Sequence, residues 1–320
     1  MARSVKYRFG KLNNRDDSAS LGYFSDKRSP LITTMVEATN VEIYDGESAS
    51  RRGGYTEKNP VGGHSLFCTK DGVGGFLVVA EALHQLNLDF TTTALAPLAN
   101  NSRMWMEEIN GMVLASNGTD LLLVSNGAII PMPSPAEQHE IPFPACRFLT
   151  FFKGVIYGAT ADGIVMTKAY SLLSDERHFL IPLANVSMIA AVDDGLWVGT
   201  TDKVYWLGGK GDDEFTLKEV FPYGVISGAF SQFNAGVISD SADKELAVIM
   251  ATPEGICIGR GAGSLDNISI DDVAIGGGSS GCCYVRETEG GAFFLVAIEG
   301  TGGRNIFTGT EFVTNEQTYT

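Results

Sequence analysis

RMWMEEINGMVLASNGTDLLLVSNG, residues Arg103–Gly127, contains the pattern that predicts the fold. Its apolar runs are separated by short polar turns, which carry Asn-Gly at Asn110-Gly111 and Asn117-Gly118. Asn-Gly readily adopts the positive φ angles that a tight hairpin needs. The segment therefore predicts short antiparallel strands that follow one another through hairpins.

The same order of strands and turns recurs along the chain, and this recurrence indicates a repeat architecture. A fourth strand per repeat is expected in stretches such as Ala128–Met132 and Phe215–Val220. Four short antiparallel strands in about 40 residues are typical of one β-propeller blade. Successive repeats begin 38, 44, 40, 42 and 52 residues apart, at Ser65, Arg103, Arg147, Ser187, Ala229 and Gly281.

The sequence thus predicts an all-β protein, with an extended N-terminal arm over residues 1–37 and a β-propeller over residues 38–320. Six blades are visible. A hairpin at Asn40–Tyr55, which turns at Asp45-Gly46, would complete the last blade or begin a seventh. Two β-sandwich domains are the alternative, because no WD or kelch signature recurs. One helical turn is expected, at Ser171–Phe179.

Composition limits the class of protein. The chain of 320 residues is 44% apolar and has 38 glycines, which favours a globular fold with many turns. It has no apolar run of 18 residues and no apolar segment near the N-terminus, so we expect neither a membrane span nor a secretory signal. The five cysteines form no Cys-x-x-Cys pair, which favours reduced, structural thiols in a protein made in the cytoplasm.

Charge is unevenly distributed along the chain. The net charge is −15, but residues 1–60 hold 10 Lys/Arg against 8 Asp/Glu, whereas residues 61–320 hold 13 against 30. Such an acidic body should repel nucleic acid. The arm, with few apolar residues, is expected either to fray or to dock on an acidic neighbour, such as the body of an adjacent copy.

The sequence predicts no catalytic residue, cofactor or metal site. Gly259–Ser264 (GRGAGS) resembles a phosphate-binding loop, but no helix is expected after it. The paired acids at Asp193-Asp194, Asp212–Glu214 and Asp271-Asp272 are expected in solvated turns. The four histidines have no metal-ligand spacing, and no nucleophile motif appears. The three tryptophans are expected to pack between blades. The histidines are His64, His84, His139 and His178, and the tryptophans are Trp105, Trp197 and Trp206.

The order of features along the chain resembles a family of bacteriophage virion proteins. The features are a basic, Asn-rich lead, FGKLNNRDDS (Phe9–Ser18), then ATNVEIYDGESASRRGGYT (Ala38–Thr56), then the train of repeats. This order is most similar to the tail nozzle proteins of short-tailed phages. The resemblance implies a non-enzymatic structural subunit that forms a cyclic ring with other tail or connector proteins. DNA would pass through the ring without specific binding.

A basic arm on an acidic body favours head-to-tail assembly, in which Arg51 and Arg52 are expected to contact a neighbouring subunit or an adaptor. The alternative for them is solvated surface charge. Other functions remain open: a carbohydrate-binding or glycan-cleaving propeller at a host-facing tail tip, a virion surface or decoration protein, or a cellular scaffold. The expected location is the tail of a virion assembled in a bacterial cytoplasm. The candidate interface residues are Arg3, Arg8, Arg15, Arg51, Arg52 and Tyr55.

Overall fold

The computed structural model describes residues 62–299 apart from 73, 210–214, 238–244, 270–274 and 289–290. It also describes the backbone of five strands outside that range. These are β1 (Arg8–Leu12), β2 (Ile32–Met35), β3 (Val41–Tyr44), β4 (Ser48–Arg51) and β29 (Thr310–Thr314). The chain divides into two compact units, residues 1–54 with 192–320 and residues 55–191. No helix in the described part is long and apolar enough to cross a membrane.

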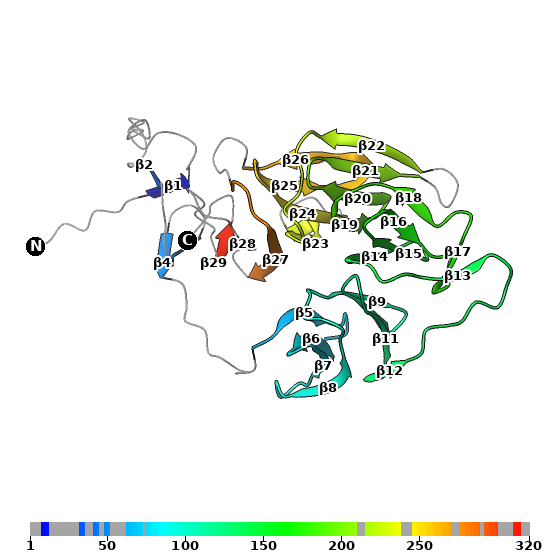
Figure 1. Cartoon of the computed structure of the whole chain (residues 1–320). Helices are drawn as coiled ribbons and strands as arrows, with labels where there is room; N and C mark the ends of the chain where they lie inside the picture. Colours follow the sequence, from blue (N-terminus) through cyan, green and yellow to red (C-terminus); the bar gives the residue numbers. More distant parts are fainter. Residues whose placement is uncertain are drawn as a thin grey trace, which may run out of the picture. The chain divides into compact units, whose positions relative to one another are not determined.

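In the unit of residues 55–191, three four-stranded antiparallel sheets follow one another in chain order (Figure 1). The first consists of β5 (His64–Cys68), β6 (Gly75–Val79), β7 (Ala82–Leu86) and β8 (Thr92–Pro97). The second consists of β9 (Trp105–Ile109), β10 (Met112–Ser116), β11 (Leu121–Ser125) and β12 (Ala128–Ile130). The third consists of β14 (Phe148–Phe152), β15 (Val155–Ala159), β16 (Gly163–Met166) and β18 (Leu180–Pro182).

A small two-stranded sheet is formed by β13 (Glu140–Pro142), which precedes the third sheet in the sequence, and β17 (Leu173–Asp175), which falls between β16 and β18. The helical turn expected at Ser171–Phe179 is wrong. Ser174 is buried in β17, and its hydroxyl donates to the Met166 carbonyl instead of capping a helix. Pairing with β13 therefore outweighs the local preference of this serine for a cap.

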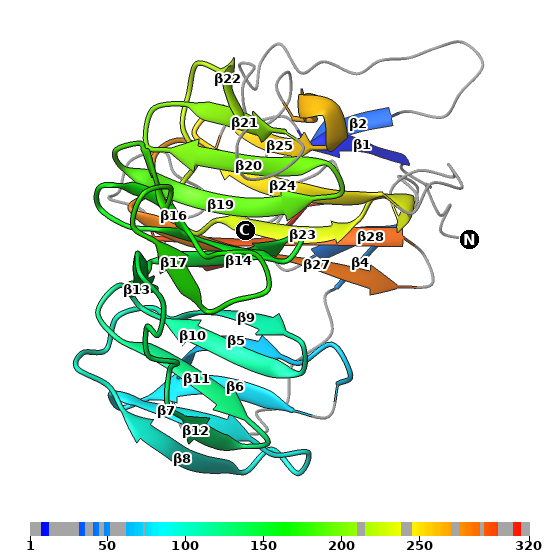
Figure 2. The ribbon, with the colours of Figure 1, turned by 90° about the vertical axis from the view of Figure 1, so that its right-hand side faces the viewer.

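Three further sheets continue the pattern along the chain (Figure 2). One sheet consists of β19 (Val186–Val192), β20 (Gly195–Thr200), β21 (Val204–Gly208) and β22 (Thr216–Phe221). The next consists of β23 (Phe230–Asn234), β24 (Leu246–Thr252), β25 (Gly255–Gly259) and β26 (Leu265–Asn267). A three-stranded sheet follows, from β27 (Ser280–Thr288), β28 (Gly291–Glu299) and β29.

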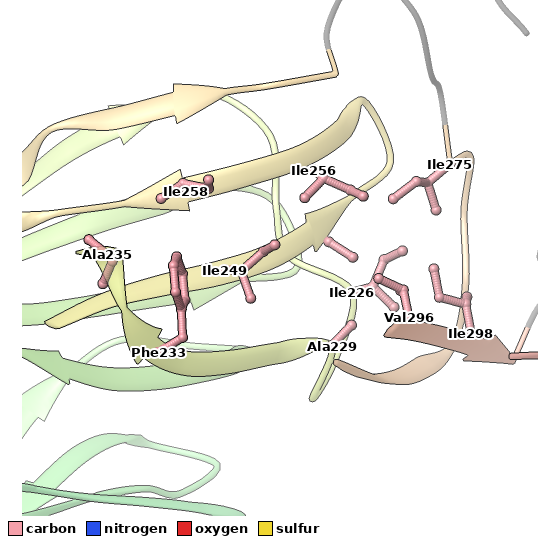
Figure 3. Packing of buried hydrophobic residues seen from close by; sticks show 12 residues of the cluster. Ile226, Ala229, Phe233, Ala235, Ile249, Ile256, Ile258, Ile275, Val296 and Ile298 are labelled. Atoms are coloured by element: carbon pink, nitrogen blue, oxygen red, sulfur yellow. The ribbon is translucent and has the colours of Figure 1, made fainter. Parts of the chain in front are cut away.

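Consecutive sheets bury apolar side chains against each other. Phe76, Val78 and Leu83 of the first sheet pack with Val113 and Val124 of the second. The second and third sheets share another core, which includes Leu114 and Leu149. Figure 3 shows the equivalent core in the other unit, where side chains of β24 and β25 face those of β28. It includes Ile249, Ile256, Ile258, Val296 and Ile298.

Small antiparallel sheets that stack face to face in chain order make this fold an all-β, β-propeller architecture. The predicted fold class is confirmed, and a pair of β-sandwiches is not what the described strands form. The predicted turn at Asn110-Gly111 is also confirmed, because both residues have positive φ.

The N-terminal hairpin forms as predicted, since β3 pairs antiparallel with β4, with Val41 opposite Arg51 and Tyr44 opposite Ser48. It is a separate two-stranded sheet, not a strand of one of the six sheets. Within the predicted arm, β1 pairs in parallel with β2, so this segment contains two strands. β1 also contacts β4.

Candidate functional site

A bulge in β5 creates the most unusual constellation of polar side chains in the described residues. His64 pairs with Val78 and Phe67 with Phe76, so three steps along β5 match two along β6. Side chains one residue apart on a regular strand point to opposite faces. The extra residue in β5 breaks that alternation, and the side chains of His64 and Ser65 meet.

Three side chains form one hydrogen-bonded chain at this bulge. The Ser65 hydroxyl lies 2.8 Å from His64 Nδ1, and His64 Nε2 lies 3.1 Å from Asn101 Oδ1. Asn101 Oδ1 also accepts a longer bond, of 3.4 Å, from the Glu81 N–H. Because this oxygen can only accept, His64 carries its hydrogen on Nε2. Nδ1 is therefore the acceptor for the Ser65 O–H.

The backbone holds Ser65 in this position. Its φ angle is +56°, in the left-handed region that non-glycine residues seldom adopt. The Met104 N–H donates to Ser65 Oγ over 2.8 Å, which ties the bulge to the start of β9. His64 and Ser65 are partly exposed and Asn101 is exposed, so solvent reaches the group. Leu66, the next residue in the bulge, is 66% exposed.

A second polar group surrounds the β13–β17 sheet. Lys168 Nζ lies 2.8 Å from Glu140 and 3.1 Å from Glu137. Glu140 also accepts the backbone N–H groups of Ala136 and Glu137, and these bonds with Lys168 lower its pKa to about 2. Such contacts organise the loop before β13. They stabilise an ionised carboxylate and do not prepare an acid or a base for chemistry at neutral pH.

Glu107 is the exceptional carboxyl group of the described residues. It lies on β9 on the same strand face as Trp105 and Ile109, which belong to the core between the second and third sheets. Burial raises the pKa of Glu107 to about 7, a rise opposed by the charge of Lys70 and assisted by that of Glu108. A proton is therefore held on this residue near neutral pH.

The glycine-rich loop at Gly259–Ser264 serves packing. The ring centroids of Trp197 and Trp206 lie 5.0 Å apart, and the Trp197 indole N–H donates to the Arg260 carbonyl. A Cβ on Gly259 would lie 2.7 Å from Trp197, and one on Gly263 would lie 2.9 Å from Trp206. The prediction that these tryptophans pack between blades is confirmed.

The paired acids Asp193-Asp194 are not simply solvated. Asp193 accepts the Leu246 N–H, and Asp194 accepts the Ala262 N–H, so each caps a backbone group of the next sheet. The Ala262 N–H is thereby occupied by a carboxylate and is not free for a phosphate. The acids Asp212–Glu214 and Asp271-Asp272 lie outside the described residues.

The remaining residues that the sequence singled out include the cysteines and two histidines, His84 and His139. All five cysteines are free thiols, and burial raises the pKa of Cys146 and Cys257 to about 12. Within the described residues, no group of His, Cys, Asp and Glu could hold a metal ion. His139 pairs with Glu176, and His84 Nδ1 is buried without a hydrogen-bond partner.

The structure places only part of the predicted interface. The backbones of Arg8 and Arg51 lie in β1 and β4, two strands that contact each other. Their side chains fall outside the described residues, as do all atoms of the remaining four, Arg3, Arg15, Arg52 and Tyr55. Sequence reasoning missed the group at His64, because Asn101 is 37 residues away. The adjacent His-Ser pair was the one visible signal.

Comparisons with known proteins identify no family for the chain. No protein-family model matches it, and no curated protein matches it. Similar solved structures include BBS1N in complex with ARL6DN, with 11% identity over 71% of each chain and a TM-score of 0.48. An inactive virginiamycin B lyase from Staphylococcus aureus has 15% identity over 79% of this chain and 82% of its own, with a TM-score of 0.46.

A third similar structure is a functionally unknown protein from Desulfotomaculum acetoxidans. It has 12% identity over 78% of this chain and 88% of its own, with a TM-score of 0.49. At such identities and TM-scores these similarities carry no argument about fold or function.

Proposed function

We propose that this chain is a structural subunit of a bacteriophage tail, a nozzle- or hub-like component that assembles in a cyclic ring around the DNA channel. The N-terminal segment would contact a neighbouring copy or a connector protein. The acidic propeller body would let DNA pass, because a surface rich in carboxylates offers phosphates no counterion-releasing contacts.

The observation that carries the proposal is the combination, on one chain, of a basic N-terminal arm and an acidic body. The segment on which the resemblance rests contains the β3–β4 hairpin, and β4 ends at Arg51, directly before Arg52. Strand β1, with Arg8, contacts β4. Against this segment stands a remainder of 30 acidic and 13 basic residues. Complementary charges on one chain favour contacts between copies.

The mass of the purified full-length protein in solution tests this proposal. Light scattering behind size-exclusion chromatography, at rising protein concentration, should give a multiple of 34.2 kDa. Removing residues 1–37 should return the mass to that of one chain. A single-chain mass for the full-length protein at every concentration would argue against a ring subunit.

A charge-reversal pair sharpens the assignment to the hairpin. Arg51→Glu with Arg52→Glu should weaken assembly, because each substitution replaces a positive charge at the proposed contact with a negative one. Lys203→Glu with Lys218→Glu is the matched control, because Lys218 is exposed on β22 and Lys203 is half-exposed directly before β21. Equal loss of assembly in the two double variants would show that total charge, not the hairpin, controls the association.

A further inference from the structure

We propose that Ser65, His64 and Asn101 form a nucleophilic centre that accepts an acyl group from a carboxylic ester. The inference does not rest on the tail role, because all three residues lie in the unit of residues 55–191 and none in the N-terminal segment. A ring subunit can carry a local hydrolytic centre, and a monomer can equally well.

The order of hydrogen bonds is the one that a nucleophile, a base and an orienting group require. Ser65 donates to His64 Nδ1 at 2.8 Å, and His64 donates through Nε2 to Asn101 at 3.1 Å. Asn101 Oδ1 thus selects the ring tautomer whose lone pair faces the serine. An orienting amide in place of a carboxylate keeps the imidazole position but adds no negative charge.

The bulge is the second observation that points to function. It holds a serine at φ +56°, a conformation that costs a non-glycine residue on the order of 1 kcal/mol or more. Bulges beside active sites re-aim a side chain. Here the re-aimed side chain is the one that meets the histidine. Glycine would adopt the same backbone conformation in an architectural bulge without this cost.

The chemistry balances without a further cofactor. Ser65 Oγ attacks the carbonyl carbon of the ester, and its proton moves to His64 Nδ1. The bond from the carbonyl carbon to the alcohol oxygen then breaks, and His64 returns the proton to the departing alcohol. Water, with His64 again accepting a proton, hydrolyses the acyl-serine and restores the hydroxyl.

The surroundings indicate a small, accessible ester. All three groups reach solvent, and Leu66, 66% exposed, adjoins Ser65 in the same bulge. An apolar side chain beside the nucleophile favours an apolar acyl or alkyl portion. The cation of Arg103 is held over the Trp105 ring, 5.3 Å from its centroid, one residue before Met104, whose N–H bonds Ser65.

The test is covalent labelling of the full-length protein with a fluorophosphonate, followed by peptide mass spectrometry. Ser65 should be the labelled serine, and p-nitrophenyl acetate should be cleaved in parallel. Ser65→Ala should abolish both. His64→Gln, which retains Ser65, should slow labelling by about 100-fold or more. The exposed Ser102→Ala variant should label as the unaltered chain does.

Asn101 is a positioning residue, and its test uses a conservative rescue. Asn101→Asp retains an acceptor for His64 Nε2 and should keep most of the labelling rate, whereas Asn101→Leu should lose it. Circular dichroism checks that each variant folds. Absence of label at Ser65 in a folded protein overturns the proposal, and so does equally fast labelling of His64→Gln. The hydrogen bonds would then only tie β5 to the loop before β9.

Discussion

At the residue scale, the half-buried carboxyl of Glu107 makes the protein less stable as pH rises. Its pKa in the folded chain is about 7 rather than 4.5, because burial disfavours the ionised form. The folded state therefore binds more protons than the unfolded state between these values, and stability falls across that interval. Above about pH 7 the full penalty, about 3 kcal/mol, is present.

Replacing Glu107 by Gln should remove this penalty. We expect the melting temperature of Glu107→Gln to exceed that of the unaltered chain at pH 8 and to match it near pH 4. Glu254→Gln, at the exposed turn between β24 and β25, is the control. If the melting temperatures of Glu107→Gln and the unaltered chain differed by the same amount at both pH values, the raised pKa of Glu107 would be refuted.

Gly195 has a role that the sequence does not reveal. It follows the turn at Asp193-Asp194, yet neither Asp194 nor Gly195 is among the residues with positive φ. Gly195 begins β20, and a Cβ there would lie 2.5 Å from Trp206 and 2.8 Å from the Leu207 carbonyl oxygen. The glycine makes room for an indole ring, a need that only the packed sheets reveal.

Gly195→Ala should therefore lower the free energy of unfolding by about 2 kcal/mol, the usual cost of overpacking a core. Gly277→Ala is the matched control, since nothing lies within 4 Å of the added methyl group. Thermal melts followed by circular dichroism would measure both. Equal melting temperatures for the two variants would mean that Trp206 moves aside at little cost.

At the scale of elements, Lys168 holds the β13–β17 sheet to the loop before it. Lys168 Nζ bonds the carboxylates of Glu137 and Glu140, and the bond to Lys168 helps to lower the pKa of Glu140. The three side chains form one ion-pair cluster. The Glu140 contribution is present above the ordinary carboxyl pKa of 4.5. It disappears as the pH falls toward about 2, where the folded carboxyl takes up its proton.

Lys168→Ala should raise the pKa of Glu140 toward its ordinary value, as measured by carbon-13 NMR titration of the carboxyl group. The same variant should speed proteolytic cleavage within residues 131–139 at neutral pH. Lys203→Ala removes the exposed Lys203–Glu219 pair and should change neither quantity. Equal cleavage rates for Lys168→Ala and Lys203→Ala would show that the ion-pair cluster of Lys168 does not stabilise this loop.

Periodicity identified most strands because each repeat carries its own turns. The fourth strands expected at Ala128–Met132 and Phe215–Val220 are β12 and β22. Other turns lack the usual signal: Ala80 and Glu81 both have positive φ without a glycine. The bulge at Ser65 depends on which residue of β6 faces each residue of β5. Register of this kind follows from long-range pairing, which a local pattern does not contain.

At the scale of the whole molecule, the charge division predicts salt-sensitive assembly. Contacts between a basic N-terminal segment and an acidic body weaken as the screening length falls, from about 10 Å in 0.1 M salt to about 3 Å in 1 M. Sedimentation velocity should show the assembly dissociating across this range. Assembly that strengthens with salt would indicate an apolar interface instead.

The sequence predicted the class of fold well, since each four-stranded sheet is encoded within about 40 consecutive residues. It could not predict the grouping of residues 1–54 with 192–320, because that association joins segments far apart in the chain. The candidate interface remains a prediction for the same reason. Its residues all lie before the repeats begin, where no periodic pattern indicates a partner.

Electron microscopy of the purified full-length protein tests the central claim most directly. Class averages should show a rotationally symmetric ring of several copies with an axial opening, and the ring should disappear when residues 1–37 are removed. Particles of one chain's mass at every concentration and salt would contradict the account.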